Sequence, residues 1–401
     1  MDITISPQKL HGLIQVIPSK SQAHRYLICA ALADQPTSIG CAETSRDMDA
    51  TADCLRALGA KIKRTDTGYQ ISPITEVPEA ALLPCRDSGS TLRFLLPVAG
   101  ALGVDATFQM EGRLPQRPLS PLWEEMERMG CILSRPTADT IRCQGRLRPG
   151  TYTIPGNISS QYITGLLFGL SLLDGHSRID ITGKLESEPY VAMTRQTLRK
   201  FRVYATPEFI KGGRAYRSPK SVQVEGDCSN AAFFQAAYQL GNQVMTVCPL
   251  ENDSVQGDRV AAHLLFELKH HQTIDASDIP DLVPILSVMA AANEGAVFTN
   301  IGRLRLKESD RVASTIAMIE SLGGCAWATE DTLTVAAGVV CVVTICHTGR
   351  CLGRRHCCDM TGSRNHNICQ YKLMIFDRLI NLIAFFQKSK QMPVLLLLFL
   401  S

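Results

Sequence analysis

Residues 18–25 (PSKSQAHR) place a lysine, two hydroxyl side chains and an arginine within eight positions, directly after a strand-like opening of the chain. If Ser19 or Ser21 caps a helix that begins near residue 22, Lys20 stands at the mouth of this helix and Arg25 lies one turn inside it. Because a helix N-terminus also offers free amides and a positive dipole end, the stretch predicts a phosphate site. It also fits a capped surface helix with two solvated cations.

Two later loops have the same character. Residues 86–93 (RDSGSTLR) run into an apolar helix, where Gly89 allows close backbone approach and the hydroxyls can donate to an anion. Residues 112–118 (GRLPQRP) form a proline-stiffened loop that presents Arg113 and Arg117. Taken alone, each loop also fits a turn that merely caps a helix.

Neutral hydrogen-bonding groups follow, of the kind that read a polyhydroxylated ring. They lie in residues 156–162 (GNISSQY), which open an apolar helix, and in residues 187–190 (SEPY). An ordinary N-cap and an ordinary turn are the alternatives.

Carboxylates and further cations come last. Residues 278–281 (DIPD) supply two carboxylates before a helix, and residues 302–311 (GRLRLKESDR) hold four cations and two acids. Such groups suit acid–base chemistry on a charged ligand. Asp281 as a helix cap, and Lys307 with Glu308 as a solvated pair, are the alternatives.

The elements that must position these loops repeat along the chain. Three amphipathic helices end at Gly59, Gly130 and Gly323 and lead into extended segments, and the first two glycines are 71 residues apart. Residues 194–203 resemble a further copy without its glycine, and residues 260–270 a fourth helix of the same kind. This period exceeds those of solenoids and predicts repeated β-α-β units in two domains. The alternative is that helices commonly end in this way.

Length and charge agree with two ordinary domains. The chain of 401 residues is too long for one compact core, and 45% hydrophobic with 20% charged residues is typical of a soluble globular protein. The net charge of +3 hides a basic tail, because residues 339–401 carry eight Lys or Arg against two acids. The first 338 residues are therefore at −3, without the basic stripe of a nucleic-acid surface.

The N-terminal sequence MDITIS alternates like a strand and lacks the charged-then-apolar order of a secretion signal. Nine of the fifteen cysteines are spread singly through residues 1–338, which favours buried reduced thiols over a disulfide framework. We therefore expect a cytoplasmic protein.

Taken together and in order, these segments resemble the enolpyruvyl transferases, and within them the EPSP synthases. The resemblance runs from Lys20 to about Ala328 and rests on seven ordered matches. The matches are Ser19-Lys20-Ser21 with Arg25, the loop at 87–93, Arg117-Pro118, Ser159-Ser160-Gln161, Ser187 with Pro189-Tyr190, residues 278–281, and residues 307–311. The resemblance implies transfer of the enolpyruvyl group of phosphoenolpyruvate to the 5-hydroxyl of shikimate 3-phosphate, with release of phosphate.

The implied fold is a two-domain inside-out α/β barrel, each domain built from three β-α-β-α-β-β units with helix N-termini directed at the cleft. The chain is expected to cross near Ser19, to build the shikimate-3-phosphate side over residues 19–224, and to return near Glu225. The second domain would then hold residues 1–18 and 225–338. No metal or other cofactor is implied. The implied partners are the two small substrates, not nucleic acid or a membrane, and a monomer is expected.

The resemblance also implies roles for single residues. Lys20 would protonate the methylene carbon of phosphoenolpyruvate, Asp281 would accept the 5-hydroxyl proton, and Glu308 would assist proton movement. The residues expected to hold shikimate 3-phosphate are Lys20, Ser21, Arg25, Ser159, Ser160, Gln161, Ser187, Tyr190, Asp281 and Lys307. Those expected to hold phosphoenolpyruvate are Lys20, Gly89, Arg117 and Arg311.

The chain departs from the family pattern in three places. Asp87 stands where the family usually has asparagine, and Arg303 where an asparagine often contacts shikimate. The family's Asp-His-Arg helix start and late lysine do not occur, and from Val339 six cysteines and three histidines follow in 63 residues. We interpret residues 339–401 as out of register with the family, as a shifted reading frame would produce. Zinc and a membrane anchor fit less well, because paired cysteine spacings and an apolar run of about 20 residues do not occur there.

Two alternative functions stay open at this point. One is a non-catalytic remnant that binds shikimate 3-phosphate without turnover. The other is a sister transferase acting on a UDP-sugar, which the Ser-Ser-Gln and Lys-Glu-Ser-Asp-Arg segments disfavour.

Overall fold

Each four-stranded sheet in the described part of the chain joins a parallel strand pair to an antiparallel hairpin. The structure is a computed structural model and describes residues 11–338 apart from 214–215, 242–243 and 249. One complete unit contains β5 (Ala80–Arg86), α3 (Gly89–Leu102), β6 (Asp105–Met110), η1 (Leu114–Gln116), α4 (Leu122–Arg128), β7 (Cys131–Ser134) and β8 (Thr140–Gly145). Its strands are ordered β5-β6-β8-β7, with α3 as the crossover between the two parallel strands.

Further sheets repeat this order. The second unit contains β9 (Thr151–Pro155), α5 (Ser160–Leu170), β10 (His176–Thr182), α6 (Glu188–Lys200), β11 (Ala205–Thr206) and β12 (Phe209–Lys211). The third contains β15 (Gln272–Asp275), α9 (Val283–Ala291), β16 (Ala296–Thr299), η3 (Gly302–Leu306), α10 (Arg311–Ser321), β17 (Ala326–Ala328) and β18 (Thr332–Val335). The repeated units that the sequence predicts are therefore present.

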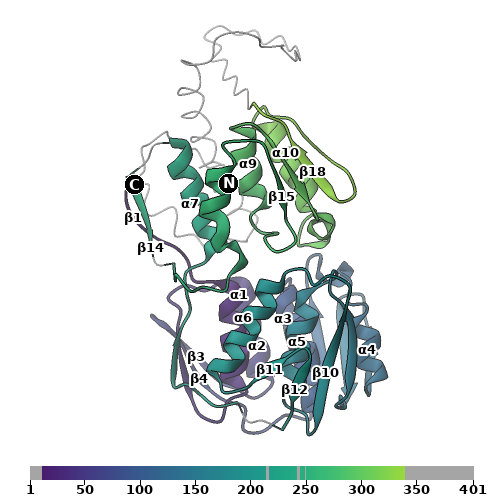
Figure 1. Cartoon of the computed structure of the whole chain (residues 1–401). Helices are drawn as coiled ribbons and strands as arrows, with labels where there is room; N and C mark the ends of the chain where they lie inside the picture. Colours follow the sequence, from purple (N-terminus) through teal and green to yellow (C-terminus); the bar gives the residue numbers. More distant parts are fainter. Residues whose placement is uncertain (1–10, 214–215, 242–243, 249, 339–401) are drawn as a thin grey trace, which may run out of the picture.

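The remaining units are assembled from distant parts of the chain. One contains α1 (Lys20–Ala31), β2 (Thr37–Gly40), α2 (Arg46–Ala57), β3 (Lys61–Thr65) and β4 (Gly68–Ser72), with β13 (Ser221–Gln223) parallel to β2. The other contains β1 (His11–Gln15), α7 (Cys228–Gly241), β14 (Val244–Cys248), η2 (Gly257–Val260) and α8 (Ala261–Glu267), with β1 parallel to β14. These long-range pairings require the chain to pass twice between the two bodies seen in Figure 1.

The two passages lie side by side. Pro18 pairs with Gly226 in an antiparallel bridge, and the Ser19 amide donates to the Glu225 carbonyl at 2.8 Å. One apolar core spans Ala23 to Val224 and a second spans Ala232 to Val335. We call the body around the first core the lower domain and the body around the second the upper domain, as they lie in Figure 1.

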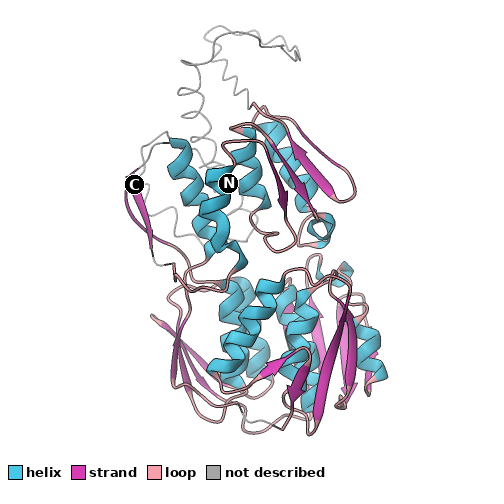
Figure 2. Ribbon diagram, in the orientation of Figure 1, coloured by secondary structure: helices cyan, strands magenta, loops and turns pink. Residues whose placement is uncertain are grey.

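The lower domain is built with helices inside and sheets outside (Figure 2). Of the residues in α3, 12 of 14 are buried, and α5 and α1 are buried nearly all round. A helix that is apolar on every side needs neighbours on every side, so the sheets pack around the helices. In β6, by contrast, Ala106, Phe108 and Met110 face inward and alternate with residues that are more exposed. The inside-out two-domain fold that the resemblance implies is confirmed.

The predicted helix ends also follow their glycines. Gly59, Gly130 and Gly323 have φ values of +105°, +112° and +86°, and each stands between a helix and the strand that follows it. In the copy that lacks the glycine, Arg202 after α6 adopts φ +61° itself. This conformation is sterically unfavourable for arginine. The left-handed turn after the helix is therefore repeated in this copy although the glycine is not.

One predicted helix start differs from the structure, and two predicted segments lie outside the described residues. The first helix, α1, begins at Lys20, two residues earlier than expected, and puts the lysine in its first turn. The strand expected at residues 1–6 and the atypical tail 339–401 lie outside the described residues. Within the described residues, we find neither a helix long and apolar enough to cross a membrane nor a group of three metal-ligating side chains.

The packing of α5 on α3 leads to a test. A Cβ on Gly165 would lie 2.2 Å from the Arg93 carbonyl oxygen of α3, so the helices can approach only because residue 165 is glycine. We expect Gly165→Ala to lower the free energy of unfolding by about 1–3 kcal/mol in chemical denaturation. Gly302→Ala is the control, because its Cβ would meet nothing closer than 3.5 Å. Equal stability of both variants would contradict the packing.

Candidate functional site: an anion-binding cleft

A cavity of about 120 Å³ lies between the two domains and is lined by both. Of the residues predicted from the sequence to form the site, all but Gly89 line it. The polar side chains around it are those of Lys20, Ser21, Arg25, Ser90, Arg93, Arg117, Ser159, Ser160, Gln161, Tyr162, Ser187, Tyr190, Asp281, Arg303, Lys307, Glu308 and Arg311.

Helix N-termini converge on this cavity. In the lower domain, α1, α3, α5 and α6 each have a residue of their first turn in its wall, and in the upper domain Arg311 opens α10 there. The first amides of a helix have no partner within the helix, and the dipole makes this end positive. Five such ends facing one space form an anion-binding cleft before any side-chain charge is added.

Side chains at the helix starts fix the loops that enter them. Ser88 caps α3 by accepting from the Thr91 amide at 3.2 Å, and Ser159 caps α5 by accepting from the Gln161 amide at 3.3 Å. The Gln161 side chain then accepts from Arg93 at 3.0 Å and donates to Ser90 at 2.9 Å. Two of the caps that the sequence offered as an alternative to a ligand site therefore exist, and they hold the cleft residues in place. Ser19, by contrast, precedes α1 without a side-chain cap bond.

Lys20 is held at the mouth of α1 by a carboxylate. Its Nζ lies 2.8 Å from Asp47 Oδ2, and the two side chains are 40% and 32% exposed. Burial would lower the pKa of Lys20, but the nearby carboxylates of Asp47, Glu308 and Asp281 outweigh it and raise the pKa. Lys20 is therefore a protonated cation at the cleft, with a donor available to an anionic ligand.

Arg25 lies deeper and is fixed by the lower domain. It is only 2% exposed, and it donates to Thr194 Oγ1 at 2.8 Å, to the Tyr190 carbonyl at 2.9 Å and to the Ser21 carbonyl at 2.6 Å. These bonds orient the guanidinium rigidly, which is what a charged group needs if it is to bind without reorganisation.

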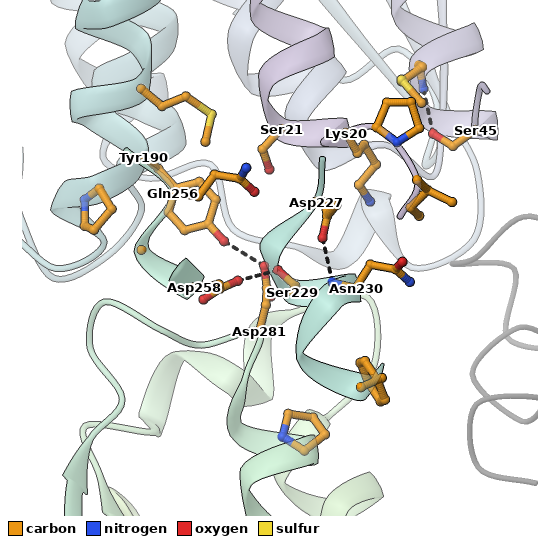
Figure 3. Close-up of a pocket in the computed structure, with 18 of the residues that line it drawn as sticks. Lys20, Ser21, Ser45, Tyr190, Asp227, Ser229, Asn230, Gln256, Asp258 and Asp281 are labelled. Atoms are coloured by element: carbon orange, nitrogen blue, oxygen red, sulfur yellow. Dashed lines mark hydrogen bonds between the residues drawn. The ribbon is translucent and has the colours of Figure 1, made fainter. Parts of the chain in front are cut away.

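The upper domain contributes both carboxylates of the cleft. Asp281 accepts from the Tyr190 hydroxyl at 2.7 Å and pairs with Arg311, and Figure 3 shows the Tyr190 ring directed at Asp281 across the domain boundary. Glu308 lies 3.4 Å from both Arg117 and Arg311. Asp281 is thus no helix cap: Leu282 takes that place in α9, and Asp281 joins the two domains instead.

Positive charge dominates the cavity wall. Among the described lining residues, seven cations face the two carboxylates. Burial would raise the pKa of Asp281 and of Glu308, but Arg311 and the other cations hold both pKa values well below their usual range. Burial also lowers the pKa of Lys307 to about 8. The cleft is therefore cationic at neutral pH and loses one charge just above it.

The remaining predicted residue and the two departures from the family pattern lie close by. An added Cβ at Gly89 would lie 2.5 Å from Arg93 Nη1 and 2.6 Å from Arg117 Nη1, so the glycine backbone stands directly against both guanidinium groups. Asp87 packs against Gly112, and burial raises its pKa. Arg303 lines the cavity and pairs with Glu186 at 2.5 Å.

The predicted site residues did not include Ser90, Arg93, Tyr162 or Arg303, which line the cavity, or Asp47, which pairs with Lys20. Arg93 and Ser90 line the cavity, and the motif RDSGSTLR already contained both of them. Asp47, the partner of Lys20, lies in the first turn of α2, which Ser45 caps by accepting from the Met48 amide. The sequence signal for this helix start was available, but nothing in it indicates that α2 packs beside Lys20.

A second cavity of about 190 Å³ adjoins the first and shares some of its lining residues (Figure 3). It shares Lys20, Ser21, Tyr190, Asp281 and Arg311 with the first cavity, and its other lining residues come from both domains, including Ser45, Asp227 and Asp258. Burial raises the pKa of Asp227 to about 6 and raises the pKa of Asp258 well above its usual value. Both carboxylates are therefore easier to protonate than free aspartates.

The fold and this site define a class: two-domain α/β proteins with an inside-out architecture and an anion-binding cleft between the domains. Comparison with known proteins is more specific. The family model described as EPSP synthase (3-phosphoshikimate 1-carboxyvinyltransferase) matches residues 5–349. The chain therefore belongs to the EPSP synthase family.

Curated relatives and solved structures agree with this assignment. A 3-phosphoshikimate 1-carboxyvinyltransferase of Clostridium kluyveri is 36% identical over 358 residues, covering 83% of this chain and 84% of the relative. One of Clostridium acetobutylicum is 37% identical over 360 residues, with the same coverage. The EPSP synthase structure from Acinetobacter baumannii superposes with a TM-score of 0.66 at 19% identity and covers 83% of each chain, which shows the shared fold.

The low pKa of Lys307 predicts how the cleft responds to pH. Because Lys307 is charged below about pH 8 and neutral above it, an anion should bind more weakly as the pH rises through this value. We expect the affinity for inorganic phosphate, measured by calorimetry from pH 7 to about 9.5, to fall severalfold. Lys307→Arg should flatten this profile, since arginine stays charged. A flat profile for the unaltered protein would contradict the prediction.

Proposed function

We propose that the chain transfers the enolpyruvyl group of phosphoenolpyruvate to the 5-hydroxyl of shikimate 3-phosphate, giving 5-enolpyruvylshikimate 3-phosphate and phosphate. This is the shikimate-pathway step that leads to aromatic amino acids. The observation that carries the proposal is the convergence of five helix N-termini and seven cations on one cleft, in a chain of the EPSP synthase family. Both substrates are polyanions, and this cleft supplies the fixed positive charge that they need.

We further propose how the cleft is divided between the two substrates. Shikimate 3-phosphate would lie against the lower domain, with its phosphate near Arg25 and the starts of α5 and α6. The residues proposed to hold it are Lys20, Ser21, Arg25, Ser159, Ser160, Gln161, Ser187, Tyr190, Asp281 and Lys307. Phosphoenolpyruvate would lie at Lys20, Gly89, Arg117 and Arg311, where the start of α3 meets the upper domain.

The chemistry moves three protons: one arrives at the methylene carbon, one leaves the 5-hydroxyl and one leaves the methyl group, and the departing phosphate takes up one, so that the protons balance. Lys20 would protonate the methylene carbon of phosphoenolpyruvate, and its raised pKa keeps the ammonium group protonated. The 5-hydroxyl oxygen would then bond to the cationic carbon while Asp281 takes the hydroxyl proton. Loss of a methyl proton, assisted by Glu308, would expel phosphate from the tetrahedral intermediate and restore the double bond.

We also propose the domain boundaries, the cellular location and the oligomeric state. We propose residues 19–224 as the shikimate-3-phosphate domain and residues 1–18 with 225–338 as the other, a division that the two separate cores support. Seven buried free cysteines among the described residues support a reducing, cytoplasmic location. The ligands of the proposed protein are small molecules, and we propose that it acts as a monomer without a metal or other cofactor.

Lys20→Met is the direct test of this proposal. Without the ammonium group the methylene carbon loses its donor, and a general acid contributes about 10²–10⁴-fold to a rate. We expect phosphate release from the two substrates to fall by at least about a hundredfold. Lys61→Met is the matched control, because Lys61 is exposed on β3, and it should keep the full rate.

The outcomes separate the competing functions. Retained turnover in Lys20→Met would remove the lysine from its assigned role. If the unaltered chain binds shikimate 3-phosphate but releases no phosphate, the chain is a non-catalytic remnant. Turnover only with a UDP-sugar acceptor would point to the sister transferases.

A further inference from the structure

A loop of the lower domain is clasped by the upper domain at the edge of the cleft. Ser187 donates its backbone amide to the Ser277 carbonyl at 3.0 Å, and the Glu188 amide donates to Asp278 Oδ1 at 3.1 Å. Outside these bonds, Lys184 Nζ lies 3.0 Å from Asp275 Oδ2 in an exposed ion pair. The loop that opens α6 is therefore bonded along its length to the loop that follows β15.

Arg303 joins this loop from the other side. Its Nε lies 2.5 Å from Glu186 Oε2, its Nη2 donates to the Ser277 carbonyl at 2.7 Å, and its Nη1 donates to Ser187 Oγ at 3.1 Å. The side chains of Arg303 and Glu186 are each only 15% exposed. Nη1 and Nη2 thus each donate a hydrogen bond, whereas Nε forms an ion pair with Glu186 without hydrogen-bond geometry. Two of the three oxygens belong to the lower domain and one to the upper domain that carries Arg303.

Ser187 needs this support because its backbone is strained. It adopts φ +58° and ψ +37°, in the left-handed region that non-glycine residues rarely enter. Such a conformation persists only where surrounding contacts hold it. Here the holding contacts, from Ser277 and Arg303, come from the upper domain. Contacts with the upper domain therefore support Ser187 in its observed orientation, beside the bond that its carbonyl accepts from the Tyr190 amide within the lower domain.

We propose that Arg303 is a positioning residue: paired with Glu186, it locks the domains together and sets Ser187 in the geometry that receives the substrate's phosphate. This rests on the proposed function for the identity of the ligand. Domain closure and completion of the phosphate-binding side are then one event, because the same guanidinium performs both. Breaking the pair leaves the largely buried carboxylate of Glu186 without its partner, which disfavours the closed state.

Amide exchange tests the clasp without any substrate. We expect Arg303→Gln and Glu186→Gln to speed hydrogen–deuterium exchange in peptides covering residues 184–190 and 275–281, while peptides from the buried helix α3 stay unchanged. Lys184→Gln is the matched control, because it removes an interdomain ion pair that is 61% and 49% exposed and hence weak. Exchange that is unchanged in both clasp variants would overturn the proposal.

Measuring the affinity for shikimate 3-phosphate is the second part of the test. We expect each single variant to weaken shikimate 3-phosphate binding by about tenfold, and the double variant Glu186→Gln/Arg303→Gln to be no weaker than either, as for two halves of one contact. Arg303→Lys should fall between the unaltered protein and Arg303→Gln, since lysine keeps the charge but cannot span three partners.

The two arms separate the clasp from the function. If Arg303→Gln weakens binding while Glu186→Gln leaves binding unchanged, Arg303 is a direct ligand and the positioning role is wrong. If the unaltered protein binds no shikimate 3-phosphate, the proposed function fails, yet the exchange arm still decides whether the clasp exists. Should Arg303→Gln fail to fold, Glu186→Gln carries the same test from the other domain.

Discussion

Repulsion between fixed positive groups is the constraint on which this structure depends. Five helix N-termini and seven cations share one small cavity, and the two carboxylates among its described lining residues balance only part of that charge. Groups of like charge are costly to bring together in a partly buried space, so the fixed cations of the cleft repel one another. An anionic ligand relieves the repulsion, and its binding should therefore stabilise the closed arrangement of the domains.

The architecture makes this arrangement possible because it reverses the usual layering. The apolar helices α1, α3 and α5 lie inside the lower domain, and their axes lead to the domain boundary (Figure 1). Sheets on the outside hold them parallel enough for their first turns to meet. The upper domain then closes the space with α10 and with the carboxylates that tune the cations. Residues of both domains form the site, so contacts such as the hydrogen bond from Tyr190 to Asp281 cross the domain boundary.

Much of the fold and of the site could be predicted from the sequence, since local chemistry decides it. The glycine helix ends at Gly59, Gly130 and Gly323 marked repeated units, and the serine-rich loops marked helix starts. The site prediction came from motif order, and the cavity gathers those residues from both domains. Asp47 and the clasp of Arg303 with Glu186 escaped it, because no spacing along the chain encodes a partner far away in sequence.

By itself, the sequence determined which groups are available: cations, hydroxyls and carboxylates at the starts of helices, in an order typical of one family. It determined these because capping, glycine turns and apolar periodicity act over a few residues. Only the tertiary structure decided which of them share a space and in which charge state. Burial and neighbouring charges set the pKa of Lys307 to about 8 and hold the pKa of Asp281 well below its usual range, and both effects arise only when folding brings these residues together.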